Sequence, residues 1–136
     1  MTAHSGSQLS VVIADDNRDS ADSLKMLLEL EGHAVQTAHD GAQAFDLVER
    51  VKPRVVLLDI GMPKLNGYEV AAKIRTQPWG VRVKLIALTG WGQSQDRERA
   101  MAAGFDHHLT KPVDPEAVLS LLRQTQPWSS ATGAPS

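Results

Sequence analysis

Five polar side chains in this chain each stand at or just beyond the C-terminal end of an apolar run of strand length: Asp15, Asp16, Asp59, Thr89 and Lys111. If these runs are neighbouring strands, three carboxylates meet, and like charges this close are tolerated when a cation neutralises them. Oxygen ligands with no His or Cys nearby favour Mg²⁺. A lysine ammonium and a threonine hydroxyl opposite the cation suit a phosphoryl group, whose oxygens need positive charge and hydrogen-bond donors. Asp59 would then be a nucleophile that becomes an aspartyl phosphate.

The apolar runs alternate along the chain with segments of helical periodicity. The expected strands cover 9–14, 33–38, 54–58, 83–88 and 105–109. The expected helices, one of them at about 93–103, stop at Gly32, Pro53, Pro78 and Gly104, and a last helix begins at Asp114 and Pro115. This alternation predicts βαβ units, and right-handed crossovers then give a parallel sheet with helices on both faces. Ligands of such a sheet bind beyond the carboxyl ends of its strands, so the five polar side chains are expected to converge.

The composition is that of an ordinary soluble globular domain, with 42% apolar and 22% charged residues in a length of 136. The net charge of −2 gives no electrostatic reason to expect nucleic acid or an anionic membrane as a partner. The chain has no cysteine, which excludes disulfides and thiolate metal sites. A basic segment followed by an apolar one is absent from the N-terminal MTAHSGSQLS, and no run of about 18 apolar residues occurs, so a cytoplasmic location is expected.

Several motifs, taken in order, resemble those of the receiver domain of two-component response regulators: Asp15-Asp16, Asp59 followed by Met62-Pro63 and Gly67, Thr89, and Lys111-Pro112. The resemblance covers residues 9–125, with 1–8 as an N-terminal extension and 126–136 as a flexible tail. It implies an α/β, flavodoxin-like, doubly wound sheet of five parallel strands in the order 2-1-3-4-5 with five helices. The segment 88–116 is similar in particular to receivers attached to hybrid sensor kinases. There is no room here for a kinase, so a single-domain regulator or an excised piece is expected.

The resemblance also implies a role for each residue of the set. Asp59 would be the phosphoacceptor, and Thr89 and Lys111 would hold the phosphoryl oxygens. Mg²⁺ would be bound by Asp15, Asp16, Asp59 and the main-chain carbonyl of Gly61. The phosphoryl donor would be a sensor histidine kinase or a histidine phosphotransfer protein, and the output would pass to a downstream protein target that the sequence does not identify.

A switch is implied at Thr89 and at the position three residues before Lys111. The family often has an aromatic residue at that position, which moves inward when the threonine engages phosphate. His108 stands there instead, and its flat imidazole can fill the same space, which predicts a weaker or differently arranged switch. The resemblance places the output on the face made by the fourth helix, fifth strand and fifth helix. Gly61 and Trp91 flank the site without polar groups that orient an attacking water, so slow self-dephosphorylation is expected.

Three other classes of protein are alternatives to a phosphoacceptor receiver domain. A Mg²⁺-dependent phosphatase or phosphotransferase resembling the haloacid dehalogenase group would carry a second aspartate two residues after the nucleophile and a cap domain. Position 61 is glycine and no cap fits, so no enzymatic activity is expected. A degenerate receiver that serves only as a binding module would lack the acidic residues or the lysine, all of which are present here. A nucleotide-binding protein would need a Gly-rich loop after the first strand, and none follows it in this sequence.

Each residue taken alone also has a purely structural interpretation. The aspartate pair could cap the first helix through Asp16, or Asn17 could do so. Asp59 could be a turn former, and Lys111 before proline is common in loops. The histidines outside the switch position have no metal-ligand spacing and are predicted to be surface or strand residues: His33, His39 and His107. Four strand ends that converge favour the phosphoryl site over these separate explanations.

Overall fold

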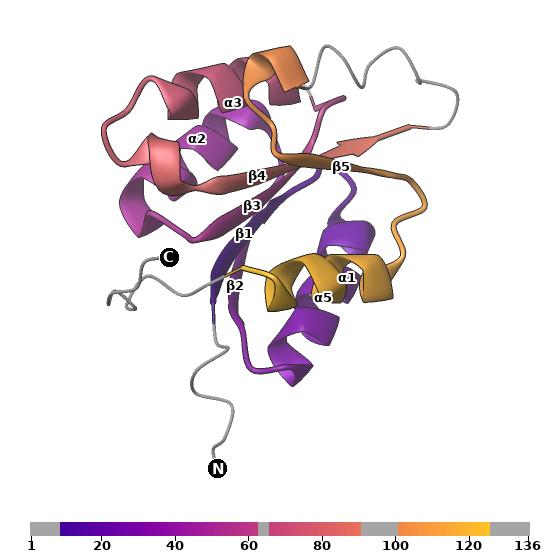
Figure 1. Cartoon of the computed structure of the whole chain (residues 1–136). Coiled ribbons are helices and arrows are strands. Elements are labelled where there is room, and N and C mark those ends of the chain that lie inside the picture. The colour runs from indigo at the N-terminus through magenta and orange to yellow at the C-terminus, as the bar shows by residue number, and fades with distance from the viewer. Residues whose placement is uncertain (1–8, 63–65, 91–100, 126–136) are drawn as a thin grey trace, which may run out of the picture.

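The computed structural model describes residues 9–62, 66–90 and 101–125, which form a parallel sheet between two layers of helices (Figure 1). The strands are β1 (Ser10–Ala14), β2 (Ala34–Ala38), β3 (Val55–Asp59), β4 (Lys84–Thr89) and β5 (His107–Thr110). The helices are α1 (Arg18–Leu30), α2 (Gly41–Val51), α3 (Gly67–Arg75) and α5 (Pro115–Arg123), with a short 3₁₀ helix, η2 (Gly80–Arg82). All four strand pairings are parallel, and the order is β2-β1-β3-β4-β5. The predicted flavodoxin-like fold with strand order 2-1-3-4-5 is confirmed.

Some predicted segments lie outside the described residues, namely 1–8, 126–136 and most of the helix expected at about 93–103, of which residues 101–103 are helical. The domain boundaries therefore stay predictions. β5 begins at His107, two residues later than predicted. Phe105 packs into the core, and Asp106 accepts the Leu85 N–H with its carboxylate while its own N–H donates to Leu85 O. The side chain of Asp106 thus replaces a main-chain acceptor, and the regular strand pairing starts after it. None of the helices in the described residues has both the length and the apolar character that a membrane span needs.

Each face of the sheet is covered by its own apolar cluster. One face packs against α2 and α3, with core residues that include Val12, Val56, Leu58 and Leu85. The opposite face packs against α1 and α5, with core residues that include Val11, Ile13, Leu57 and Ile86. Strand side chains alternate between faces, so strands buried on both faces are continuously apolar. In the three central strands, β1, β3 and β4, polar side chains are therefore confined to the strand ends.

Asparagine side chains begin two of the helices that follow the central strands. Asn17 caps α1 by accepting a hydrogen bond from Ser20 N at 3.0 Å, so of the two candidates for this cap it is Asn17 and not Asp16. Asn66 caps α3 and exchanges hydrogen bonds with Glu69, each at 3.0 Å. These caps satisfy main-chain N–H groups that the helices leave free, and they set where the chain leaves β1 and enters α3.

Arg75, at the end of α3, joins several segments beside the N-terminal ends of β4 and β5. Its guanidinium donates to the carbonyls of Gly80, Val83 and Gly104 over 2.7–2.9 Å and pairs with Asp106 at 2.9 Å. Gly104 has φ +107°, and a Cβ there would lie 2.8 Å from the Arg75 side chain, so only glycine fits. A planar guanidinium with five donors is suited to so many acceptors at once.

His33 differs from the prediction that it is a surface or strand residue. It precedes β2, is only 8% exposed, and its Nδ1 accepts a hydrogen bond from Leu9 N at 3.1 Å. Burial lowers the pKa of His33, and the nearby charge of Glu31 opposes that shift. The imidazole is thus a buried acceptor that holds the chain where it enters β1.

Candidate functional site

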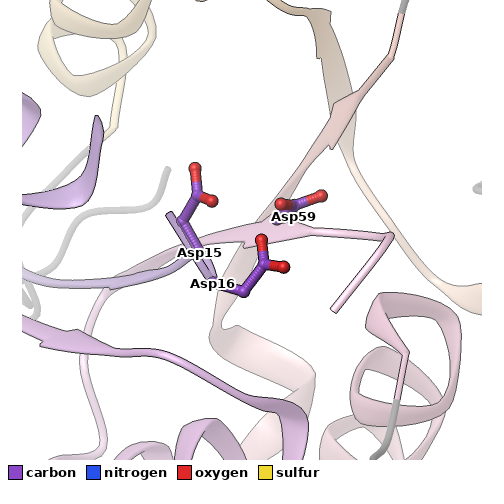
Figure 2. Close-up of side chains that lie close together, drawn as sticks. All are labelled: Asp15, Asp16 and Asp59. Carbon is purple, nitrogen blue, oxygen red and sulfur yellow. The ribbon is translucent and has the colours of Figure 1, made fainter. Parts of the chain in front are cut away.

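Three carboxylates gather where β1 and β3 end (Figure 2). Asp15 and Asp16 follow β1, Asp59 is the last residue of β3, and the two strands are neighbours in the sheet. Each of the three offers one oxygen, and these oxygens lie within 4.8 Å of one another. Asp15 and Asp59 are buried, while Asp16 is exposed. The predicted convergence of these three side chains is confirmed.

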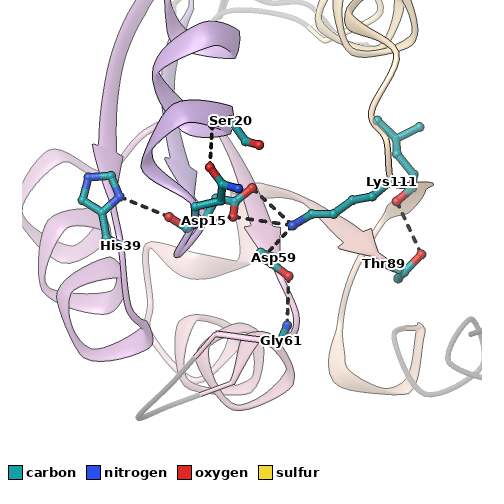
Figure 3. A network of polar contacts seen from close by, with 9 residues as sticks. Asp15, Ser20, His39, Asp59, Gly61, Thr89 and Lys111 are labelled. Carbon is teal, nitrogen blue, oxygen red and sulfur yellow. Dashed lines mark hydrogen bonds and ion pairs between the residues drawn. The ribbon is translucent and has the colours of Figure 1, made fainter. Parts of the chain in front are cut away.

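Lys111 is the counter-ion of this cluster (Figure 3). Its Nζ lies 2.8 Å from Asp59 Oδ2 and 3.3 Å from Asp15 Oδ2. It follows β5, so the site contains residues 96 positions apart in the chain. The Lys111 ammonium therefore contacts carboxylates at the ends of both β1 and β3, although β4 lies between β3 and β5 in the sheet.

The protonation equilibria of the site show how crowded its charges are. Burial raises the pKa of Asp15, and the charge of Asp59 raises it further, whereas the Asn17 N–H and the Lys111 ammonium act in the opposite direction. Burial alone would lower the pKa of Lys111, but its hydrogen bond and attraction to Asp59, with a further contribution from Asp15, leave this pKa above its ordinary value. The ammonium is thus held charged, and the carboxylates remain under mutual repulsion.

Main-chain N–H groups orient two of the carboxylates. Asp59 Oδ1 accepts from Gly61 N at 2.9 Å, and Asp15 Oδ1 accepts from Asn17 N at 2.9 Å. Each N–H lies two residues after its carboxylate, an arrangement in which a side chain folds back over its own turn. Gly61 thus lies beside the phosphoacceptor candidate, and the role of its carbonyl as a metal ligand stays a prediction.

Thr89 and His108 lie on the same face of the sheet. Thr89 ends β4, is 2% exposed, and its Oγ1 donates a long hydrogen bond of 3.4 Å to Leu109 O. His108 is paired with Ala87, two residues before Thr89, and paired parallel residues point to the same face. His108 itself is half-buried. Thr89 therefore lies at the edge of the sheet that carries the site. His108 lies on the same face, at the level of Ala87, two residues further from that edge.

A groove with a volume of about 690 Å³ opens beside the acidic cluster. Its apolar wall comes from α1 and from the segment after β5, and includes Leu24, Leu27, Pro112 and Val113. Asp15 and Lys111 also line it, so the groove leads to the charged site.

His39 is part of the site although sequence reasoning treated it as an ordinary surface or strand residue. Its Nδ1 lies 3.1 Å from the main-chain carbonyl of Asp15. Its own main-chain N–H donates to Gln43 Oε1 at 2.7 Å. No periodicity or spacing marks a hydrogen bond between residues 24 positions apart, so the sequence offered no basis for finding it.

The donor set fits Mg²⁺. It consists of carboxylate oxygens, the hard ligands that this ion prefers, and the exposed side of Asp16 leaves room for the water ligands that Mg²⁺ usually keeps. Burial is the main reason that the pKa of Asp15 is raised, and the charge of Asp59 adds to it; a bound divalent cation would offset both effects.

This fold and this site define a class of protein. Residues 11–123 match the family of the response regulator receiver domain, and the chain belongs to that family. Receiver domains are the signalling domains of two-component systems, so the predicted family and general function are confirmed, and the phosphatase alternative is not supported.

Known relatives and structures agree with this assignment. The chain is 37% identical over 117 residues to an uncharacterised 14.6 kDa protein of Leptolyngbya boryana, across 86% of this chain and 89% of that one. It is 33% identical over 127 residues to the response regulator MprA of Mycobacterium avium, across 90% of this chain but only 55% of MprA. Its fold matches the receiver domain of the sensor histidine kinase PA1611 of Pseudomonas aeruginosa, with a TM-score of 0.79 and 30% identity, across 87% of this chain and 97% of that one. In that crystal structure a magnesium ion is coordinated in the active-site cleft.

Proposed function

We propose that this domain accepts a phosphoryl group on Asp59 from a phosphohistidine of a sensor histidine kinase or a phosphotransfer protein, in a Mg²⁺-dependent reaction. The observation that supports this most is the meeting of three carboxylates with Lys111 at the ends of β1, β3 and β5. The magnesium ion in the similar receiver of PA1611 supports the choice of metal. In this proposal the acyl phosphate on Asp59 serves as a signal and not as an intermediate in the turnover of a small-molecule substrate.

Each residue of the site has a role in this proposal. Asp15, Asp16, Asp59 and the Gly61 carbonyl would hold the cation. When bound, Mg²⁺ supplies the positive charge that offsets the carboxylates and the incoming phosphoryl oxygens. Lys111 moves its ion pair from the Asp59 carboxylate to a phosphoryl oxygen, and the Thr89 hydroxyl donates to another.

The transfer is a substitution at phosphorus. An oxygen of the Asp59 carboxylate forms the new P–O bond, while the P–N bond to the donor imidazole breaks and its electron pair stays on the departing nitrogen. Gly61 N and Lys111 hold the two Asp59 oxygens at 2.9 and 2.8 Å, which limits the rotation of the nucleophile. Orientation of this kind lowers the entropy cost of reaching the transition state.

The donor protein must bring its histidine within bonding distance of Asp59. The groove between α1 and the segment after β5 is apolar on its wall and opens at Asp15 and Lys111. Leu27 is 39% exposed there, so it offers apolar contact area at the surface. We infer that the donor occupies this groove when it transfers the phosphoryl group.

Intact-mass measurement tests the proposal. The protein is mixed with Mg²⁺ and a small acyl phosphate, and we expect the mass of one added phosphoryl group, lost when a chelator replaces Mg²⁺. Asp59→Asn should show no gain, while Asp46→Asn, the same change at an exposed position of α2, should behave as wild type. Phosphorylation of Asp59→Asn would contradict the assignment of the acceptor.

We further infer that Thr89 and His108 transmit the phosphorylated state. The long Thr89 hydrogen bond to Leu109 O is weak enough to be exchanged for a phosphoryl oxygen, and His108 lies on the same face. A ligand shifts a conformational equilibrium only through contacts that differ between the states, so the phosphoryl group must contact Thr89. Amide NMR spectra with and without Mg²⁺ and beryllofluoride should show shifts that reach His108 and α5. Shifts confined to the strand-end loops would contradict this route.

A further inference from the structure

Asp16 is the acidic residue of the cluster whose side chain has no local support. Its carboxylate is exposed and, within the described residues, forms no hydrogen bond or ion pair. Asp15 and Asp59, by contrast, accept from main-chain N–H groups and pair with Lys111. The position of the Asp16 carboxylate is therefore set by its main chain, and first of all by the peptide unit that joins it to Asp15.

His39 holds that peptide unit. Its Nδ1 lies 3.1 Å from the Asp15 carbonyl oxygen, which is the oxygen of the peptide bond between Asp15 and Asp16 (Figure 3). A carbonyl oxygen has no proton to give, so Nδ1 must carry the hydrogen and donate it. The direction of this carbonyl defines the plane of the peptide unit, and rotation of that plane would swing the Cα and Cβ of Asp16.

The main chain that carries the imidazole is itself anchored on α2. The main-chain N–H of His39 donates to Gln43 Oε1, and Asp40 accepts from Gln43 N at 2.8 Å as the cap of the helix. On the other side of the acidic turn, Asn17 N donates to Asp15 Oδ1. The turn that carries Asp16 is thus held by two contacts: His39, which precedes α2, binds the Asp15 carbonyl, and Asn17, the cap of α1, binds the Asp15 carboxylate.

We propose that His39 is a positioning residue, which orients Asp16 toward a divalent cation through the Asp15 carbonyl. The inference rests on the proposed function, because it assumes that Asp16 is a ligand. Mg²⁺ requires nearly regular octahedral geometry, so a ligand that can swing binds it less well than one held in place. A role limited to joining β2 to β1 would instead stabilise the fold and leave metal affinity unchanged.

Three substitutions separate these roles by calorimetric titration of the metal-free protein with Mg²⁺. His39→Leu keeps much of the volume but removes the donor, and we expect the affinity to fall about tenfold, the low end for partners that orient metal ligands. His39→Asn places an amide N–H near the position of Nδ1, and we expect affinity within about twofold to threefold of wild type. His107→Ala removes an imidazole from the start of β5 and should leave affinity unchanged.

The outcomes are distinguishable. If wild type binds Mg²⁺ and His39→Leu binds it equally well, the positioning role is wrong while the proposed function stands. If wild type binds no Mg²⁺, the proposed function fails, and this inference fails with it. Thermal unfolding in chelator monitors folding, so a variant that lowers only the melting temperature would also count against positioning. Long-range ¹H–¹⁵N spectra of the imidazole should show a proton on Nδ1 of His39, and an unprotonated Nδ1 would overturn the proposal directly.

Discussion

Replacing Asp16 by Asn should stabilise the protein in the absence of metal. Two unit charges 4.8 Å apart repel by about 0.9 kcal/mol even at the dielectric constant of water. Asp16 faces two such neighbours, but Lys111 offsets part of their charge, and Asp15 remains adjacent in the unfolded chain. No hydrogen bond of the Asp16 side chain with another described residue is lost. We therefore expect a gain of about 1 kcal/mol in the free energy of unfolding.

Magnesium should reverse this order. A ligand that binds only the folded state stabilises it by about 2.7 kcal/mol at a hundredfold excess over its dissociation constant. Wild type receives this stabilisation in full, whereas Asp16→Asn has lost a charged ligand and receives less. The variant is then the more stable protein in chelator and the less stable one at high Mg²⁺.

Urea unfolding followed by circular dichroism, in chelator and in saturating Mg²⁺, measures both effects. Asp46→Asn is the control, because it makes the same charge change at an exposed position of α2. If Asp16→Asn were less stable than wild type in chelator while Asp46→Asn were neutral, the argument from repulsion would be refuted. If Mg²⁺ stabilised both variants equally, Asp16 would not be a ligand.

Three further changes test other parts of the molecule. Lys111→Met removes the ammonium that competes with Mg²⁺ for Asp59, so the Mg²⁺ affinity measured by calorimetry should rise about fivefold. Phosphorylation by a small acyl phosphate should slow. An unchanged phosphorylation rate would show that Lys111 does not contact the phosphoryl group. Arg75→Lys keeps the charge but cannot reach the same carbonyls, and urea unfolding should show a loss of about 2–3 kcal/mol; a loss below about 0.5 kcal/mol would show that the contacts of Arg75 contribute little. Because burial lowers the pKa of His33, the unfolded state binds the proton more readily, so the stability present above pH about 6.5 should decline as pH falls below it. His33→Asn should flatten that decline in unfolding measured between pH 7 and 5, and equal slopes would contradict the assignment.

The sequence predicted the strand-end site because one geometric rule governs it. Parallel strands bring their carboxyl ends to one edge, so Asp15, Asp59 and Lys111 had to approach one another once the strands were recognised. The pairing of Lys111 with both carboxylates could not be read in advance, since it depends on the path of the chain after β5. The sequence also could not decide whether Asp16 or Asn17 caps α1, because both residue types cap helices well.

The contacts that escaped prediction join a side chain to a distant main-chain group. His33 binds Leu9 and His39 binds Asp15, each across 24 positions, and Arg75 binds Gly104 across 29. Periodicity reports which side of an element a residue occupies, but it does not report which carbonyl or N–H lies opposite in another element. Histidine and arginine at buried or half-buried positions are therefore the residues whose roles need a structure.

In the proposed function, Lys111 and a bound cation would share the carboxylates of Asp15 and Asp59, which would link the charge balance of the site to phosphorylation. Without metal, Lys111 pairs with Asp59 and Asp15 and only partly relieves the repulsion that burial intensifies at Asp15. Bound Mg²⁺ would take over that duty, and the ammonium would become available to a phosphoryl oxygen beside Thr89. A site that was fully neutralised by its own side chains would have no such demand for a cation or for a phosphoryl group. The residual imbalance of three carboxylates against one lysine is thus the property on which the proposed binding of a cation and a phosphoryl group depends.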